Sequence, residues 1–180
     1  MFLLSALAEK YRRLRHTYGY GVHSPYAYLL LEQTRRIPRY AYYADDEIIK
    51  SAEGLGCRVK RRALMLHRLA ARYHFDRVFL TADVPEPFIL AIKKGDPNIE
   101  ICRDFTEKAH LAISCGELQN IAIIETLLND GAIVIIFSKK AVETLKTGLK
   151  EYRGLMLHGD DFILIQKRED MAFTKYSVAL

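Results

Sequence analysis

The feature that most constrains the fold is an alternation of short apolar runs with helix-length segments along residues 76–180. Short apolar runs bounded by turn-forming residues are typical of buried strands, and the segments between them have helical periodicity. We therefore expect an α/β fold with a mostly parallel sheet covered by helices. The last three runs lack intervening helices, so we expect them to form antiparallel hairpins at the C-terminus.

The expected strands cover residues 77–81, 99–102, 110–114, 132–137, 155–157, 162–166 and 173–178, and the expected helices cover residues 85–94, 117–129 and 140–152. Gly95 is expected to end the first of these helices as its left-handed C′ residue.

Residues 1–75 have a different character from the rest of the chain. They hold 14 Lys and Arg against 6 Asp and Glu, whereas residues 76–180 hold 13 against 16. Apolar spacings of three and four from Leu4 to Leu14 predict a first helix, and Ser24-Pro25 predicts the start of a second. A longer helix is expected over residues 58–74. We therefore expect a basic helical extension, residues 1–75, packed on an α/β domain of residues 76–180.

Cysteine spacing and the first residues exclude several classes of protein. Cys57, Cys102 and Cys115 are odd in number and far apart, so they predict neither a disulfide framework nor a zinc knuckle. The six histidines show no paired ligand spacing, and we expect no metal site. The apolar start has no basic residue before it and stops at Glu9, which argues against a secretory signal. No segment approaches the ~18 apolar residues of a membrane span, so we expect a cytoplasmic protein with no membrane span.

One N-terminal segment carries a family resemblance. Tyr20-Gly21-Val22-His23-Ser24-Pro25-Tyr26-Ala27-Tyr28, followed by Tyr42-Tyr43, resembles the opening of a bacterial O-methyltransferase-like group. Together with the order of helices, β/α alternation and terminal hairpin, it makes the chain similar to class I S-adenosylmethionine-dependent methyltransferases. The resemblance implies a Rossmann-like domain and, in an active member, S-adenosylmethionine as cofactor. It also implies a glycine-rich turn after the first strand and a carboxylate after the second, which hold the cofactor.

The chain departs from this pattern where the cofactor would bind. Residues 80–87 contain no glycine, and their two prolines lack a backbone N–H donor. Residues 103–109 are fewer than the dozen or so that a parallel crossover needs, so one βα unit is expected to be missing. The positions left to line an altered donor pocket are Ala82, Asp83, Asp104 and Ser114.

Two segments admit a catalytic interpretation. His23 with Ser24 provides a base and a hydroxyl, but the spacing places no acid beside them. The alternative is that Ser24 caps a helix. Cys115 follows a strand end, where sites of open α/β sheets cluster, but no nucleophile-elbow glycines flank it. The alternative there is a small buried thiol, so the sequence identifies no catalytic residue.

Basic residues of the expected helix 58–74 form a further candidate site. Its nucleic-acid-binding candidates are Arg58, Arg61, Arg62 and Arg68, accompanied by Lys60 and Arg72, and by Arg35, Arg36, Arg39, Tyr40, Tyr42 and Tyr43 earlier in the chain. Arginines bind phosphates and tyrosines stack on bases, which is typical of nucleic-acid-binding proteins. The simpler alternative is a solvated helix face with arginine stems packed on tyrosine rings. A basic helix can equally contact an acidic membrane surface or a protein partner.

These observations favour a truncated methyltransferase-like domain that no longer binds S-adenosylmethionine and acts in binding or assembly. One alternative is an active S-adenosylmethionine-dependent methyltransferase with an altered donor pocket. The other is a nucleic-acid-binding protein that uses the arginine-rich face. A protein partner, or a homodimer formed through the first helix, also stays open.

Overall fold

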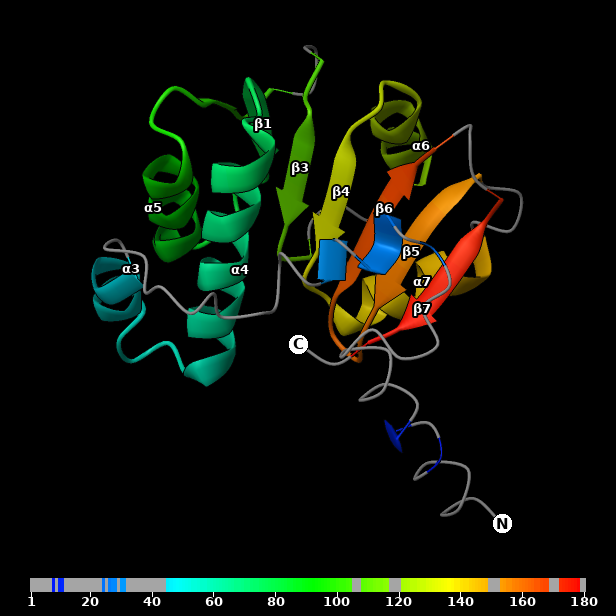
Figure 1. Cartoon of the computed structure of the whole chain (residues 1–180), viewed down its shortest axis with the longest axis horizontal. Helices are drawn as coiled ribbons and strands as arrows, with labels where there is room; N and C mark the ends of the chain where they lie inside the picture. The colour runs from blue at the N-terminus through cyan, green and yellow to red at the C-terminus, as the bar shows by residue number, and fades with distance from the viewer. Residues whose placement is uncertain are drawn as a thin grey trace.

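A seven-stranded sheet in the order β2-β1-β3-β4-β6-β5-β7 forms the centre of the molecule (Figure 1). This computed structural model describes residues 8, 10–11, 24, 26–28, 30–31, 45–104, 108–116, 121–148, 153–168 and 172–178. The strands are β1 (Arg77–Leu80), β2 (Glu100–Cys102), β3 (Leu111–Ser114), β4 (Ile133–Ile136), β5 (Gly154–His158), β6 (Ile163–Lys167) and β7 (Thr174–Ser177). Every strand falls within one residue of its expected bounds, because the apolar runs are rich in the β-branched residues that buried strands favour.

Parallel pairing dominates the sheet, as expected. β1 pairs in parallel with β2 and β3, and β3 pairs in parallel with β4. β5 and β6 form the expected antiparallel hairpin, and β6 is also antiparallel to β4. The expectation for β7 was wrong, because β7 pairs in parallel with β5 rather than in a hairpin. Both edges of β6 are already used by β4 and β5, so β7 adds to the outer edge of β5.

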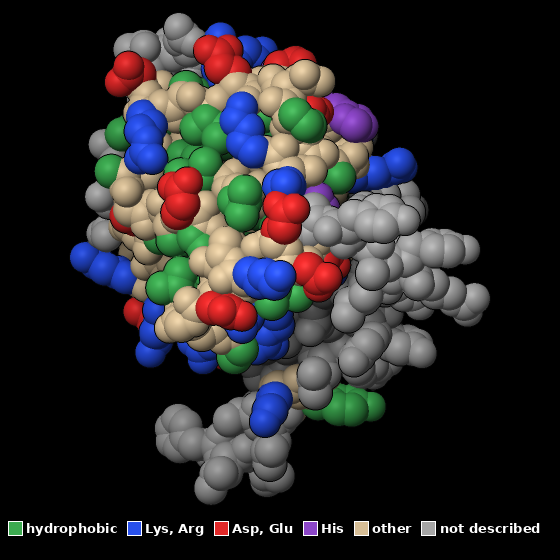
Figure 2. Space-filling view, turned by 90° about the vertical axis from the view of Figure 1, so that its left-hand side faces the viewer, with side chains coloured by type: hydrophobic (Ala, Val, Ile, Leu, Met, Phe, Trp, Pro, Cys, Tyr) green, Lys and Arg blue, Asp and Glu red, His purple; other side chains and the backbone are tan. Residues whose placement is uncertain are grey.

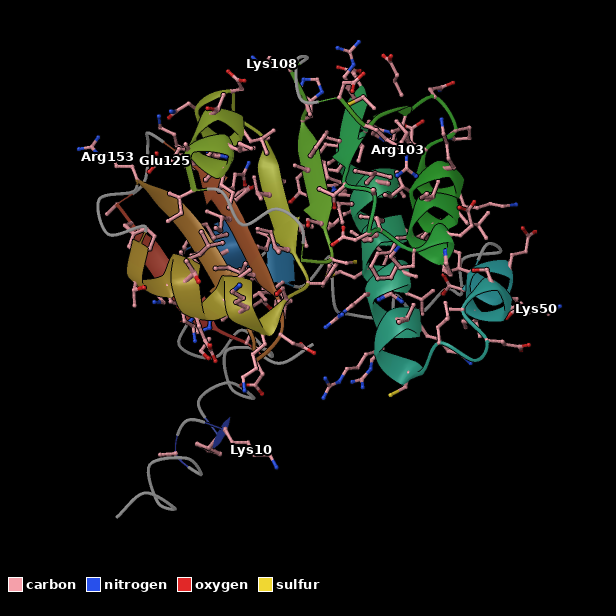
Figure 3. The ribbon with its side chains drawn as sticks, turned by 180° about the vertical axis from the view of Figure 1, so that it is seen from behind. Lys10, Lys50, Arg103, Lys108, Glu125 and Arg153 are labelled. Carbon is pink, nitrogen blue, oxygen red and sulfur yellow. The ribbon has the colours of Figure 1, made fainter. Side chains whose placement is uncertain are left out.

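Helices cover both faces of this sheet and complete the α/β fold, which is Rossmann-like in character. They are α3 (Asp45–Ser51), α4 (Cys57–Tyr73), α5 (Glu86–Gly95), α6 (Ile121–Asn129) and α7 (Lys139–Gly148). Figure 3 shows α6 and α7 in front of the sheet when the molecule is seen from behind. Residues 117–120 and 149–152, where we expected further helix, lie outside the described residues. Among the described residues, no helix combines the length and apolar character that a bilayer span requires.

Two apolar clusters form the core, one on each face of the sheet. Alternate strand residues enter different clusters: Leu111 and Ile113 pack with α4 and α5, whereas Ala112 packs with α6 and α7. This follows from the two-residue period of a strand. Ala27 and Leu30 lie in the cluster of α4 and α5, so these residues and the sheet share one core.

Gly95 ends α5 for a reason other than the one expected. It is not among the glycines with positive φ, and the C-cap residue Asp96 is extended. A Cβ atom on Gly95 would lie 2.5 Å from the backbone oxygen of His67 and 2.7 Å from the Cβ of Ala70. Glycine is therefore required because α5 approaches α4 closely, and not because the backbone is left-handed.

The connection from β2 to β3 crosses β1. β2 and β3 flank β1 on opposite sides, and residues 103–110 join them. A parallel crossover normally needs a dozen or more residues and is usually helical. In the described part of this connection, residues 103–104 and 108–110, there is no helix.

Candidate functional site

The chain changes direction across the sheet at β1. It passes from β1 to β2 on one side and then returns to β3 on the other side. The loop after β1 therefore leads toward one side of the sheet, and the loop after β3 leads toward the other. Both loops begin at the strand ends toward which the arrows point, at the lower edge of the sheet in Figure 1. Open α/β sheets bind their ligands at such a switch point. The loops after β1, β3 and β4 are therefore the candidate site.

A side chain of the protein itself bridges this switch point. Asp83, in the loop after β1, accepts a hydrogen bond at Oδ1 from the backbone N–H of Cys115, with 3.1 Å between nitrogen and oxygen. The same oxygen accepts a hydrogen bond from the hydroxyl of Thr81. Cys115 lies in the loop after β3, so the carboxylate joins the two loops between which a ligand of an open α/β sheet would lie.

The other polar groups of these loops are also used within the loops. Ser114 is fully buried, and its Oγ accepts a hydrogen bond from the backbone N–H of Gly116 at 3.1 Å. Gly116 has a φ of +145°, and its Cβ position faces Asp83 Oδ2 at 3.8 Å and Ser138 at 3.9 Å. Ser138 follows β4 and accepts a hydrogen bond from the N–H of Ala141 at the start of α7, at 3.4 Å. The hydroxyls and N–H groups named here therefore bind their own backbone or each other.

Aromatic rings pack beside this polar bridge on the face that carries α4. Phe137 directly follows β4, and its ring meets the ring of Phe88 edge-on with 5.3 Å between centroids. The guanidinium of Arg62 lies 4.7 Å from the Phe137 centroid. Phe88, Phe137 and Val84 are all buried. Phe88, Phe137 and Val84 therefore belong to the apolar core beside the strand ends on this face.

Cys115 is poorly suited to act as a nucleophile. Burial and the negative charge of Asp83 raise the pKa of its thiol to about 11, although Arg62 opposes the shift. The thiolate is the nucleophilic form, and only a minute fraction of this thiol is ionised at neutral pH. The geometry therefore favours the interpretation of Cys115 as a structural thiol.

The four positions expected to line a donor pocket have different environments. Asp83 lies in the loop after β1 and Ser114 is the last residue of β3, whereas Ala82 is exposed. Asp104 is exposed and comes two residues after β2, on the other side of β1 from Ser114. Asp104 forms no hydrogen bond or ion pair with the residues that the structure describes. The structure thus brings Asp83 close to the β3 loop, and it records no contact of Ala82 or Asp104 with that loop.

The arginines of α4 do not form one open surface. Arg58 and Arg62 each approach Oδ2 of Asp161, in the β5–β6 turn, to 2.8 Å. Arg61 donates to the backbone oxygen of Cys57 at 3.5 Å and contacts its Sγ at 3.6 Å. Arg68 is only 8% exposed. Sequence reasoning missed Asp161, because its position gives no sign of a partner about 100 residues earlier. The candidate residues earlier in the chain lie outside the described residues; they are Arg35, Arg36, Arg39, Tyr40, Tyr42 and Tyr43.

The segment that carries the family resemblance has a structural role. The Oγ of Ser24 accepts a hydrogen bond from the N–H of Ala27 at 3.2 Å, which is the expected N-cap. The backbone N–H of Ser24 lies 3.3 Å from the hydroxyl of Tyr176 on β7, and the hydroxyl of Tyr26 donates to the side-chain oxygen of Gln166 on β6. Ser24 and Tyr26 therefore fasten this segment to the sheet, while His23 lies outside the described residues.

Neither metal ligation nor a relative identifies the site. Within the described ranges, no three His, Cys, Asp or Glu side chains are grouped so that they could hold a metal ion. The three cysteines are free thiols. Comparison with protein-family models, with curated proteins and with solved structures finds no match to this chain.

Proposed function

We propose that this chain is a methyltransferase-like α/β domain without a working S-adenosylmethionine site, and that it acts by binding or assembly rather than by catalysis. The observation that carries the proposal is the hydrogen bond from Cys115 N–H to the Asp83 carboxylate across the β1–β3 switch point. A nucleotide-like ligand needs the N–H groups of these loops and close access to their backbone. Here the N–H of Cys115 already has an acceptor.

The backbone of the β1 loop gives further support. A bound cofactor would have to lie along residues 81–87, where no glycine allows close approach and where Pro85 and Pro87 offer no N–H. The short connection from β2 to β3 leaves no length for another βα unit beside β2. Both features remove parts of a cofactor pocket rather than alter them.

A binding role also suits the rest of the chain. Among the described residues of the loops after β1, β3 and β4 there is no positioned acid–base pair, since the thiol of Cys115 is protonated and Asp83 accepts hydrogen bonds from Thr81 and Cys115. The free thiols are compatible with a reducing compartment, so we place the protein in the cytoplasm. The partner on this proposal is a protein, either a different chain or a second copy.

Calorimetric titration of the full chain with S-adenosylmethionine tests the proposal. We expect no saturable heat, or a dissociation constant weaker than about 100 μM, which corresponds to about −5.5 kcal/mol. Tighter binding that is lost in the Asp104→Ala variant would contradict the proposal. It would favour an active methyltransferase with a donor pocket at Ala82, Asp83, Asp104 and Ser114. A tighter dissociation constant for S-adenosylmethionine that is unchanged in the Asp104→Ala variant would also contradict the proposal.

Nucleic-acid binding has one favourable observation. α4 carries five arginines and one lysine in 17 residues and has no Asp or Glu. Two of these cations already share Asp161, and Arg68 is buried. On the face that carries α3 and α5, the described acidic and basic side chains are interspersed (Figure 2). Binding to random RNA or DNA that weakens steeply with salt would support a nucleic-acid function, and a flat salt dependence would remove it.

A further inference from the structure

The arginines of α4 include two pairs with the same spacing. Arg58 and Arg62 are four residues apart, and so are Arg68 and Arg72. Residues four apart lie side by side on a helix, about 5–6 Å apart at Cβ, and two like charges at this spacing repel each other. An anion near such a pair offsets this repulsion.

The first pair shows how the protein meets this need. Arg58 Nη1 and Arg62 Nη2 each lie 2.8 Å from the same carboxylate oxygen, Oδ2 of Asp161. One acidic group thus sits between two guanidinium groups on adjacent turns. The pair at 58 and 62 is a two-arginine clamp with its anion supplied by the chain.

The second pair has no such anion in the described part of the chain. Arg68 is 8% exposed, and its Nε is buried without a hydrogen-bond acceptor. Neither Arg68 nor Arg72 is a member of any ion pair among the described residues. The charge of Asp45, at the start of α3, acts on His67, and no ion pair joins Asp45 to Arg68 among the described residues. A buried charge without a partner is costly, so an acceptor is expected here.

The end of the helix does not remove this need. The negative end of the helix dipole favours cations only within the last turn, which contains Arg72. Arg68 lies one turn earlier, beyond the reach of those carbonyl groups. Arg72 is exposed, so solvent reaches the pair from its side.

We propose that Arg68 and Arg72 form a second two-arginine clamp that binds a phosphate group from solution. A guanidinium presents parallel N–H donors that match two oxygens of a phosphate, and two guanidinium groups match its double negative charge. Arg68 holds the buried side of the anion, and Arg72 closes the exposed side. This site is independent of the proposed loss of the S-adenosylmethionine site, because it uses no residue of the β1 and β3 loops.

The test compares the full chain in sodium phosphate and in sodium chloride at matched ionic strength. We expect Tm to rise with phosphate concentration and calorimetry to show saturable binding of inorganic phosphate. Arg68→Met should abolish both effects and should not lower Tm in chloride, since it removes a buried charge that has no ion-pair partner in the described ranges. Arg58→Met is the matched control, because its clamp already contains Asp161, and it should keep the full phosphate response.

Two further variants keep the proposal testable if Arg68→Met does not fold. Arg68→Lys retains the charge but loses the paired donors, and it should weaken phosphate binding at least tenfold. Arg72→Met should also weaken phosphate binding at least tenfold, because it removes the guanidinium group on the exposed side of the anion. The proposal is overturned if the unaltered chain shows no phosphate-specific rise in Tm, or if the rise persists in the folded variants at positions 68 and 72.

Discussion

The Asp83 carboxylate and the backbone nitrogen of Cys115 lie 3.1 Å apart, although 32 residues separate them in the sequence. Their hydrogen bond ties the loop after β1 to the loop after β3. These loops would be the two walls of a ligand crevice in an open α/β sheet. A hydrogen bond to a charged acceptor is also stronger than one between neutral groups. The bridge therefore joins these two loops and stabilises the fold.

Replacing Asp83 should destabilise the protein. Asp83→Ala removes the acceptor for the hydroxyl of Thr81 and the N–H of Cys115, and it should lower the free energy of unfolding by about 1–2 kcal/mol. Asp83→Asn keeps a side-chain oxygen as acceptor and should cost less. Urea unfolding at neutral pH measures both changes. Equal stability of Asp83→Ala and the unaltered chain would show that the bridge is not formed in solution.

Two of the thiols should differ strongly in reactivity. Cys57 is exposed at the start of α4, and the hydrogen bond and charge of Arg61 lower the pKa of its thiol. Burial and the charge of Asp83 raise the pKa of Cys115 to about 11. Iodoacetamide near neutral pH should therefore modify Cys57 first, because the thiolate is the reactive form.

Arg61→Ala tests the cause of this difference. It should raise the pH at which Cys57 becomes reactive and should leave the rate at Cys115 unchanged, as followed by mass spectrometry of digests. A Cys115 that reacts as fast as Cys57 in the folded chain would contradict the assignment.

Acid should weaken the packing of α4 on α5 through His67. This residue is 3% exposed, and its Nδ1 lies 3.2 Å from the carbonyl oxygen of Ala91. Burial, the largest cause, lowers the pKa of His67 below its usual 6.5; the charge of Arg68 also lowers it, whereas the Ala91 hydrogen bond and Asp45 raise it. The unfolded chain therefore binds a proton at higher pH than the folded chain, so stability rises with pH between the two pKa values.

Unfolding free energies at several pH values check this prediction. The contribution of His67 should be complete above about pH 6.5, the unfolded value, and should be lost as the pH falls toward the folded value. His67→Gln should show a smaller loss over this range, because glutamine does not titrate. An identical acid dependence in both proteins would show that His67 does not contribute.

Gly95→Ala should be destabilising, although alanine is the better helix former. The helix preference gains about 1 kcal/mol. The new Cβ, however, would lie 2.5 Å from the backbone oxygen of His67. This oxygen belongs to the backbone of α4, so it cannot move unless the helix moves as well. Overpacking of this kind costs about 1–3 kcal/mol or more, so we expect a net loss in urea unfolding. Gly148→Ala in α7 is the matched control, because its Cβ meets only the flexible end of Ile121 at 3.1 Å.

The sequence predicted the layers of the fold because local signals determine them. The apolar run around β4, residues 132–137, and the turn at Asp160-Asp161 each act over a few residues. The placement of β7 beside β5 depends instead on which sheet edge remains unpaired, and no local pattern contains that information. The sequence predicts a turn role for Gly95 for the same reason, since no local pattern contains its contact with another helix.

The candidate site was predictable only in part. The missing glycines after β1 and the position of Asp83 were evident from the residues alone. That Asp83 contacts the β3 loop was not, because this contact depends on the register of β1 and β3. The spacing of Arg58 and Arg62 was visible as well, but their shared partner Asp161 comes from a distant turn.

The most direct test follows the backbone amide of Cys115 by nuclear magnetic resonance in the ¹⁵N-labelled chain. With the bridge to Asp83 in place, we predict that this amide is protected from solvent exchange and that millimolar S-adenosylmethionine leaves its resonance unmoved. Saturable shifts of the amides of Ala82, Asp104 and Cys115 on addition of S-adenosylmethionine would contradict the account, because they would place the cofactor at the loops that Asp83 bridges.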